Sequence, residues 1–144
     1  MLVQQILNAK PEQAVLTVSP GSTIREAIAV LADKRIGAVV VSSDGRRVAG
    51  ILSERDIVRE LSRKGADCLD QTVDSVMTAA IVGCTRSDTA DQVLERMTEG
   101  RFRHMPVMEA GAMIGMISIG DVVKGRLMEL AMEKDALEGM IKGF

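Results

Sequence analysis

The stretch "GILSERDIVRE" at residues 50–60 and the stretch "GMISIGDVVKG" at residues 115–125 follow one pattern. In each, a short apolar run ends at a serine, Ser53 or Ser118, and an aspartate, Asp56 or Asp121, follows three residues later. Apolar residues then continue at helical spacing. The pattern predicts a strand that leads directly into a helix, and its two copies indicate an internal repeat.

The repeat extends upstream of these stretches. "STIREAIAVLADKRIGAVVV" at 22–41 aligns with "DTADQVLERMTEGRFRHMPV" at 88–107. Each segment begins with a capping-box pattern, Thr23 with Glu26 or Thr89 with Gln92, and predicts a helix with one apolar face. Two strands joined by a turn follow in each copy, "AVVVSS" with "VAGIL" and "HMPVM" with "MIGMI".

Each copy therefore predicts the order strand, helix, strand, strand, helix. The first strands are "VLTV" at 15–18 and "IVGC" at 81–84, and short extra helices are expected at "LVQQIL" and "VDSVM". We expect a first repeat over 1–63, a linker over 64–71, and a second repeat with a long C-terminal helix over 72–144. The expected fold class is mixed α and β (α+β or α/β). Its two β-α-β-β-α repeats, related by an approximate twofold, should pack sheet to sheet because neither alone buries a large core.

The composition narrows the function classes. The 144 residues include 18 basic and 20 acidic ones, which gives no positive field for nucleic acid, and two aromatic side chains leave little surface for base stacking. No apolar run approaches the roughly 18 residues of a membrane span, and no signal-peptide pattern opens the chain, so we expect a cytoplasmic protein without membrane partners.

Catalytic chemistry has little support in the sequence. His104 is the single histidine, and neither a nucleophile beside it nor a phosphate-loop motif is present. Cys68 and Cys84 show neither zinc-ligand nor disulfide spacing, so we expect two reduced, buried thiols. We therefore expect that the protein is not an enzyme and binds neither a metal ion nor a catalytic cofactor.

The Ser-x-x-Asp pairs have two interpretations. Serine at a helix start with an acid in the first turn is a favourable cap by itself. The duplication, together with Gly50 and Gly115 in the preceding strands, also allows a ligand to approach each helix start. Backbone N–H groups there attract an anion and the carboxylate attracts hydroxyls, which suits a ribose phosphate.

Such a ligand requires nearby cations. Arg103 and His104 precede a strand of the second repeat, while Arg35 and Arg101 are expected at solvated helix ends. Arg55 lies within the first motif and could contact a phosphate or form a surface ion pair.

These residues resemble a known family. Two hydrophobic-hydrophobic-Ser-x-x-Asp motifs, "VMT" at 76–78 and "RFRHMPV" at 101–107 are similar to those of stand-alone proteins with a pair of cystathionine-beta-synthase-type (CBS) domains. The resemblance covers nearly the whole chain. It implies a regulatory module that binds an adenosine-containing ligand in a cleft between the repeats, with AMP, ATP or NAD expected ahead of S-adenosylmethionine.

The resemblance also implies residue roles. Asp56 and Asp121 would bind ribose, with Ser53 and Ser118 beside them. One niche would combine Asp56 with Thr78, the backbone of Val82, and His104. The other would combine Asp121 with Leu16, Ala38 and Arg103, although Pro11 occupies the position that corresponds to Thr78.

Partners follow from the same resemblance. Family members commonly form homodimers, and the long C-terminal helix carries apolar residues that either form a dimer face or fold back on their own domain. The leading hypothesis is a sensor of energy or redox state whose ligand-dependent conformation an unknown regulated protein recognises. The alternative is a ligand-free structural or interaction module.

Overall fold

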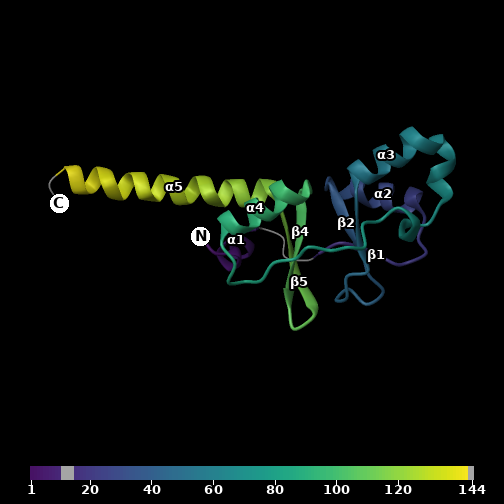
Figure 1. Ribbon diagram of the computed structural model, residues 1–144, viewed down its shortest axis with the longest axis horizontal. Helices are drawn as coiled ribbons and strands as arrows, with labels where there is room; N and C mark the ends of the chain where they lie inside the picture. The colour runs from purple at the N-terminus through teal and green to yellow at the C-terminus, as the bar shows by residue number, and fades with distance from the viewer. Residues whose placement is uncertain (11–14, 143–144) are drawn as a thin grey trace. The chain divides into compact units, whose positions relative to one another are not determined.

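The computed structural model describes residues 1–10 and 15–142 of the chain (Figure 1). The α-helices are α1 (Val3–Ala9), α2 (Ile24–Lys34), α3 (Glu54–Lys64), α4 (Ala90–Gly100) and α5 (Ile119–Ile141). The strands are β1 (Thr17–Val18), β2 (Ala38–Val41), β3 (Gly50–Ser53), β4 (His104–Glu109) and β5 (Ala112–Ser118). Two short 3-10 helices are η1 (Gly65–Asp70) and η2 (Val73–Ser75).

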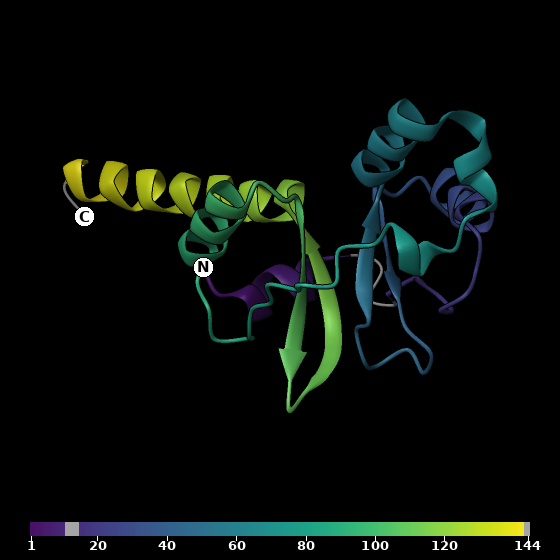
Figure 2. The same cartoon turned by 45° about the vertical axis from the view of Figure 1, so that its right-hand side comes forward.

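The duplicated element order is confirmed. Strand β2 pairs in parallel with β1 and antiparallel with β3, and β3 leads directly into α3. In the second copy β4 pairs with β5, which leads directly into α5 (Figure 2). The predicted strand at 81–84 is reduced to one parallel bridge between Cys84 and Val107. The mixed α and β class is therefore correct, with a shorter first strand in the first copy and a single bridge in its place in the second.

Two short segments differ from the predictions. The expected helix at 73–77 is the single 3-10 turn η2, and its last two residues lie outside that turn. Within the expected linker at 64–71, residues Gly65–Asp70 form η1 and bury Cys68 completely. The linker is therefore an ordered element with a core residue, since a buried apolar side chain fixes its position.

The chain divides into two compact units whose boundaries differ from the repeat boundaries. One unit comprises Met1–Gln13, Gly83–Met108 and Gly115–Phe144, and the other comprises Ala14–Val82 and Glu109–Ile114. The N-terminal segment that contains α1 thus belongs with the second repeat's helices. We refer to these as unit 1 and unit 2.

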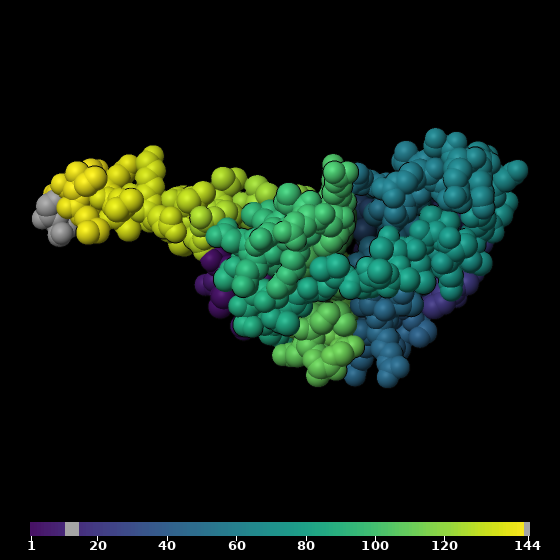
Figure 3. Space-filling model, viewed as in Figure 1, coloured from purple at the N-terminus to yellow at the C-terminus, as the bar shows by residue number. Residues whose placement is uncertain are grey.

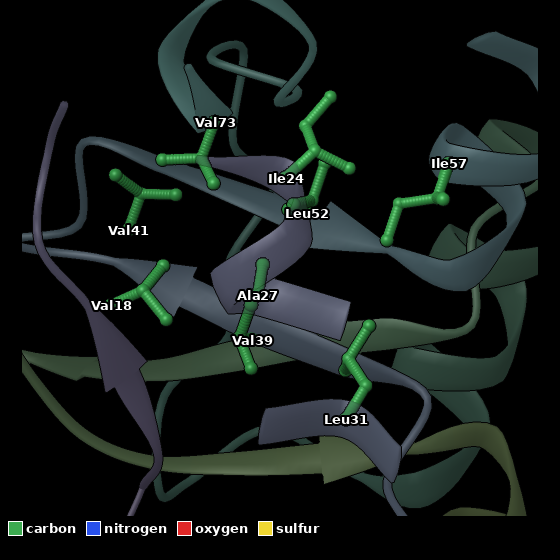
Figure 4. Close-up of a cluster of buried hydrophobic side chains, with 9 residues drawn as sticks. All are labelled: Val18, Ile24, Ala27, Leu31, Val39, Val41, Leu52, Ile57 and Val73. Atoms are coloured by element: carbon green, nitrogen blue, oxygen red, sulfur yellow. The ribbon is translucent and has the colours of Figure 1, made fainter. Parts of the chain in front are cut away.

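Unit 2 has an aliphatic core. The inward face of α2 packs against β2 and β3, and η2 supplies a further valine (Figure 4). The cluster comprises Val18, Ile24, Ala27, Leu31, Val39, Val41, Leu52, Ile57 and Val73. These α2 positions have the spacing that the sequence predicts for a buried helix face.

Unit 1 buries equivalent residues of the second copy, with two additions from α1. Val3 and Ile6 are buried here. Backbone hydrogen bonds from Val3 N–H to the Asp88 carbonyl (2.9 Å) and from Ala90 N–H to the Met1 carbonyl (2.9 Å) attach the start of α1 to the start of α4. The first repeat's opening segment therefore completes the core beneath the second repeat.

Helix α5 continues without interruption to Ile141. Its first turns pack on α1 and α4, where Val122 and Gly125 are buried. Its later turns project beyond the rest of unit 1, as the ribbon and the space-filling view show (Figures 1 and 3). Among the described residues, no helix is both long and apolar enough to cross a membrane.

Candidate functional site

Each Ser-x-x-Asp motif forms a complete capping box. Ser53 Oγ accepts a hydrogen bond from Asp56 N–H (3.3 Å), and Asp56 Oδ2 accepts one from Ser53 N–H (3.0 Å). Ser118 and Asp121 make the same two bonds at 3.1 and 2.9 Å. The interpretation of both pairs as helix caps is therefore confirmed, and each carboxylate has a fixed orientation.

Capping uses one oxygen of each carboxylate. In both motifs the bonds converge on Oδ2, and Ser53 Oγ–H adds a further bond to Asp56 Oδ2 at 3.0 Å. These capping bonds do not involve Oδ1 of Asp56 or Oδ1 of Asp121. A carboxylate oxygen can accept two, so both half-buried aspartates retain acceptor capacity for hydroxyl donors.

The two expected glycines are sites of close approach. A Cβ at Gly50 would overlap Met77 and lie 3.0 Å from the carbonyl oxygen of Thr78. A Cβ at Gly115 would lie 2.9 Å from a methyl carbon of Leu7. The strand before each motif therefore contacts a segment that comes from the opposite repeat in sequence, although each contact lies within one unit.

Beyond this contact the two copies differ. In unit 2 the chain is extended after Met77, and Thr78 forms a backbone bridge to Ile51, with Thr78 N–H donating to the Ile51 carbonyl at 2.9 Å. In unit 1 helix α1 continues to Ala9, and the equivalent carbonyl, that of Met116, accepts instead from Lys10 Nζ at 2.7 Å. A side-chain ammonium replaces a backbone amide.

Lys10 also changes the electrostatics of the second motif. Its Nζ lies 2.9 Å from Asp121 Oδ2. Burial pushes the pKa of the Asp121 carboxyl upward, but the Ser118 N–H and the Lys10 ammonium outweigh it, and the pKa falls below its ordinary value. Asp56, by contrast, is held by the amide and hydroxyl of Ser53.

The other predicted residues are divided between the units. Thr78 and Val82 lie in unit 2 with Asp56, and both are exposed, whereas His104 lies in unit 1. Leu16 and Ala38 also lie in unit 2, where Ala38 pairs with Ser53.

Arg103 lies in unit 1 with Asp121, and its carbonyl accepts a hydrogen bond from Ile119 N–H at 2.8 Å. Both predicted niches therefore draw on residues from two units, and their composition stays a prediction.

The basic residues have mixed outcomes. Arg35 and Arg101 are exposed C-caps of α2 and α4 with left-handed backbone (φ 53° and 56°), as expected for helix ends. Arg55 is exposed in the first turn of α3, and His104 begins β4 half-buried. Pro11 lies outside the described residues.

Lys10 is the site residue that sequence reasoning missed. The available signal was its position immediately before Pro11, where the first copy departs from the Thr78 pattern. Within the described chain, no group of three or more His, Cys, Asp or Glu side chains is arranged for a metal ion. Cys68 and Cys84 are free, buried thiols, as predicted.

Comparisons with known proteins identify relatives of this chain. The family profile described as "CBS domain" matches residues 4–63 and 73–127. The mitochondrial CBS domain-containing protein CBSX3 of Arabidopsis thaliana is 33% identical over 125 residues, which is 84% of this chain and 61% of the plant protein. The chain thus spans less than two thirds of that relative.

Solved structures agree with this assignment. A CBS-domain containing protein from Agrobacterium tumefaciens has 46% identity and a TM-score of 0.84, over 88% of this chain and 99% of that one. A CBS domain protein from Pyrobaculum aerophilum, solved in complex with AMP, has 25% identity and a TM-score of 0.77, over 92% of this chain and 99% of that one. The chain belongs to the CBS domain family and contains two copies of that domain.

Proposed function

We propose that this chain is a regulatory module that binds an adenosine nucleotide through Asp56 and Asp121. The observation that carries the proposal is the pair of capping boxes, which orient both carboxylates through Oδ2 while Oδ1 retains acceptor capacity. A ribose diol has two hydroxyl groups that can donate hydrogen bonds to such a carboxylate. The AMP complex of the Pyrobaculum relative supports this ligand class.

The chemistry is binding and no catalytic step is proposed. A ligand shifts a conformational equilibrium only by its difference in affinity for the two states. Ribose bound at the starts of α3 and α5 would act on helices that are continuous with the strands before them. We propose AMP, ATP or NAD as ligand and energy or redox state as the signal, which a regulated protein recognises.

Calorimetric titration of the full chain with AMP, ATP and NAD tests this function. We expect saturable heat with at least one of them, and weaker binding of the matching 2′,3′-dideoxy nucleotide, which lacks both hydroxyls. Asp56→Ala and Asp121→Ala should each weaken ribose-dependent binding. Asp135→Ala, on the exposed part of α5, is the control and should leave it unchanged. Equal affinity for ribose and dideoxyribose ligands would contradict the proposal.

A ligand-free interaction module is the second candidate. The capping boxes favour it, because they give Ser53, Asp56, Ser118 and Asp121 a structural role without a ligand. The melting temperature separates the two candidates. A ligand at about 100 times its Kd stabilises the folded state by about 2.7 kcal/mol, whereas an interaction module melts at the same temperature with or without nucleotide.

We also propose that a second copy of the chain covers α5. One set of exposed residues on α5 recurs at alternating spacings of four and three. This is the spacing of the contact seam in a coiled coil, and the set contains one lysine. The seam comprises Val123, Leu127, Leu130, Lys134, Leu137 and Ile141. The apolar members are 42% to 83% exposed in the single chain, so the seam has no cover within unit 1.

The charges beside the seam favour antiparallel pairing. Parallel helices would place Lys134 against Lys134 of the second copy, and Glu133 against Glu138 of the second copy. An antiparallel pair centred near residue 132 places Lys124 beside Glu138 of the second copy and surrounds each Lys134 with leucine and glutamate. The antiparallel pair brings Glu133 near Glu133 of the second copy, but it removes the Lys134 to Lys134 contact within the seam and adds the Lys124–Glu138 pair, so it is the one proposed.

A further inference from the structure

Lys10 distinguishes the two Ser-x-x-Asp motifs by a full charge. Its ammonium donates to the Met116 carbonyl at 2.7 Å and pairs with Asp121 Oδ2 at 2.9 Å, and it is only partly exposed. An ammonium has three donors, so one remains after these two bonds. The equivalent carbonyl in the first motif, that of Ile51, is satisfied by the uncharged Thr78 amide.

The position of Lys10 is built into unit 1. Helix α1 begins on backbone bonds to the segment before α4, and Leu7 packs where Gly115 leaves room for it. The C-cap N–H of Lys10 then donates to the Leu7 carbonyl at 3.2 Å. The ammonium therefore stands beside Asp121 because of the fold, and a substitution at Lys10 changes the charge without removing these supports.

We infer that Lys10 is a specificity-determining residue that makes the Asp121 niche select nucleotides with an anionic group over neutral nucleosides and sulfonium ligands. The inference rests on the proposed nucleotide-binding function and deepens it. A ribose held on Asp121 keeps its own phosphate within roughly 10 Å of the ammonium, about one Debye length at an ionic strength of about 0.1 M. Without the lysine, Asp121 would present that phosphate with an uncompensated negative charge.

The test measures the ratio of the Kd values for adenosine and AMP in the full chain carrying Asp56→Ala, which leaves the Asp121 niche as the ribose site. In this background we expect AMP to bind more tightly than adenosine. Lys10→Gln keeps a neutral donor for Met116 and should lower the ratio at least about tenfold, which is about 1.4 kcal/mol. Lys10→Arg keeps the charge and should keep the ratio within about threefold, about 0.65 kcal/mol.

Controls make the result specific. Lys142→Met removes one exposed lysine that lies about 30 Å from Asp121 along the α5 axis, so the ratio should not change. Raising the salt concentration should reduce the ratio in the Lys10 chain but should not reduce it in the Lys10→Gln chain, where salt can only screen the repulsion between Asp121 and the phosphate. Melting curves establish that each variant is folded before it is titrated.

Two outcomes would overturn the inference. In the first, Lys10→Gln leaves the ratio unchanged, including the case in which adenosine and AMP both bind more tightly by the same factor because Lys10 only blocks the niche. In the second, the wild-type chain binds AMP but the Asp56→Ala chain binds neither ligand, so the Asp121 niche binds no nucleotide while the proposed function stands. Failure of the wild-type chain to bind any adenosine ligand would instead reject the proposed function itself.

Discussion

At the scale of single residues, Asp56 and Asp121 occupy the same motif position in different electrostatic surroundings. Both carboxylates cap their own helices through Oδ2, but Asp121 also pairs with Lys10. The structural and binding roles are compatible, because a cap holds the side chain still and a hydroxyl can bind the other oxygen. Preorganised acceptors lose less entropy on binding than mobile ones.

Replacement of Asp121 should reveal its contribution to stability through pH. Its pKa is lowered in the folded chain, despite burial, by the Ser118 amide and Lys10. The ionised carboxylate therefore stabilises the fold above its unfolded pKa of about 3.9, and this contribution is lost as pH falls through the lower folded pKa. Asp121→Asn should reduce the free energy of unfolding by roughly 1–2 kcal/mol at pH 7 and by less near pH 3.

Urea denaturation followed by circular dichroism at both pH values measures this difference. Asp135→Asn, at an exposed position of the same helix, should have little effect at either pH. A loss of stability at Asp121 that is the same at pH 7 and pH 3 would contradict the prediction.

Cys84 should be chemically inert in the folded protein. Burial raises the pKa of its thiol to about 12, with a further upward contribution from Asp88 that Arg96 opposes. The thiolate is the reactive form, so its population at pH 8 is very small. We expect iodoacetamide to modify Cys84 only after denaturant is added, as read by mass spectrometry of the digested protein. Rapid modification without denaturant would show that the thiol is accessible.

At the scale of secondary structure, the elements that repeat in sequence were the most predictable. The apolar faces of α2 and α4 and their threonine caps follow directly from the helical spacing. Thr23 Oγ1 caps α2 by accepting from the Glu26 N–H, but the reciprocal bond from the Thr23 N–H to the Glu26 carboxylate is absent, whereas Thr89 and Gln92 form both bonds. A glutamate in the first turn can remain solvated. A glutamate three residues after the capping threonine therefore does not ensure the second bond of a capping box.

Other features depend on tertiary contacts that no local pattern contains. The strand expected at 81–84 is one bridge, and "KGADCLDQ" buries Cys68 although its composition is typical of a linker. The contacts of Lys10 depend on how far α1 continues past Leu7. A helical pattern in sequence defines the middle of a helix better than its last residues, which is where Lys10 lies.

Helix α5 provides a prediction about assembly. A charge in the seam should separate the proposed dimer, because an apolar knob would be replaced by a buried carboxylate. Leu137→Glu is expected to halve the mass measured by light scattering, while Ala136→Glu, on the neighbouring exposed position outside the seam, should keep the dimer. A wild-type chain that stays monomeric at high concentration would contradict the proposed pairing.

At the scale of the whole molecule, the two units are not the two repeats. The chain passes between units after residues 13, 82, 108 and 114. Val3 and Ile6 from the first repeat are buried in unit 1, and Val73 from the second repeat is buried in unit 2. Each compact unit therefore depends on residues from both halves of the sequence.

Separate fragments should fail to fold. A fragment of residues 72–144 lacks Val3 and Ile6, and a fragment of residues 1–63 lacks Val73. Loss of a buried aliphatic side chain typically costs 2–5 kcal/mol, a large part of the stability of a small domain. Circular dichroism of each fragment alone should show no cooperative melting. A sharp transition in either fragment would contradict the prediction.

The same exchange of segments has a use in split-protein reconstitution. A break at Gln71, between η1 and η2, leaves each piece carrying part of the other piece's interior, so neither is complete and neither has a substitute for what it lacks. Mixed together, the two pieces should associate without any added fusion partner, and the recovery of a cooperative melt would report their reunion.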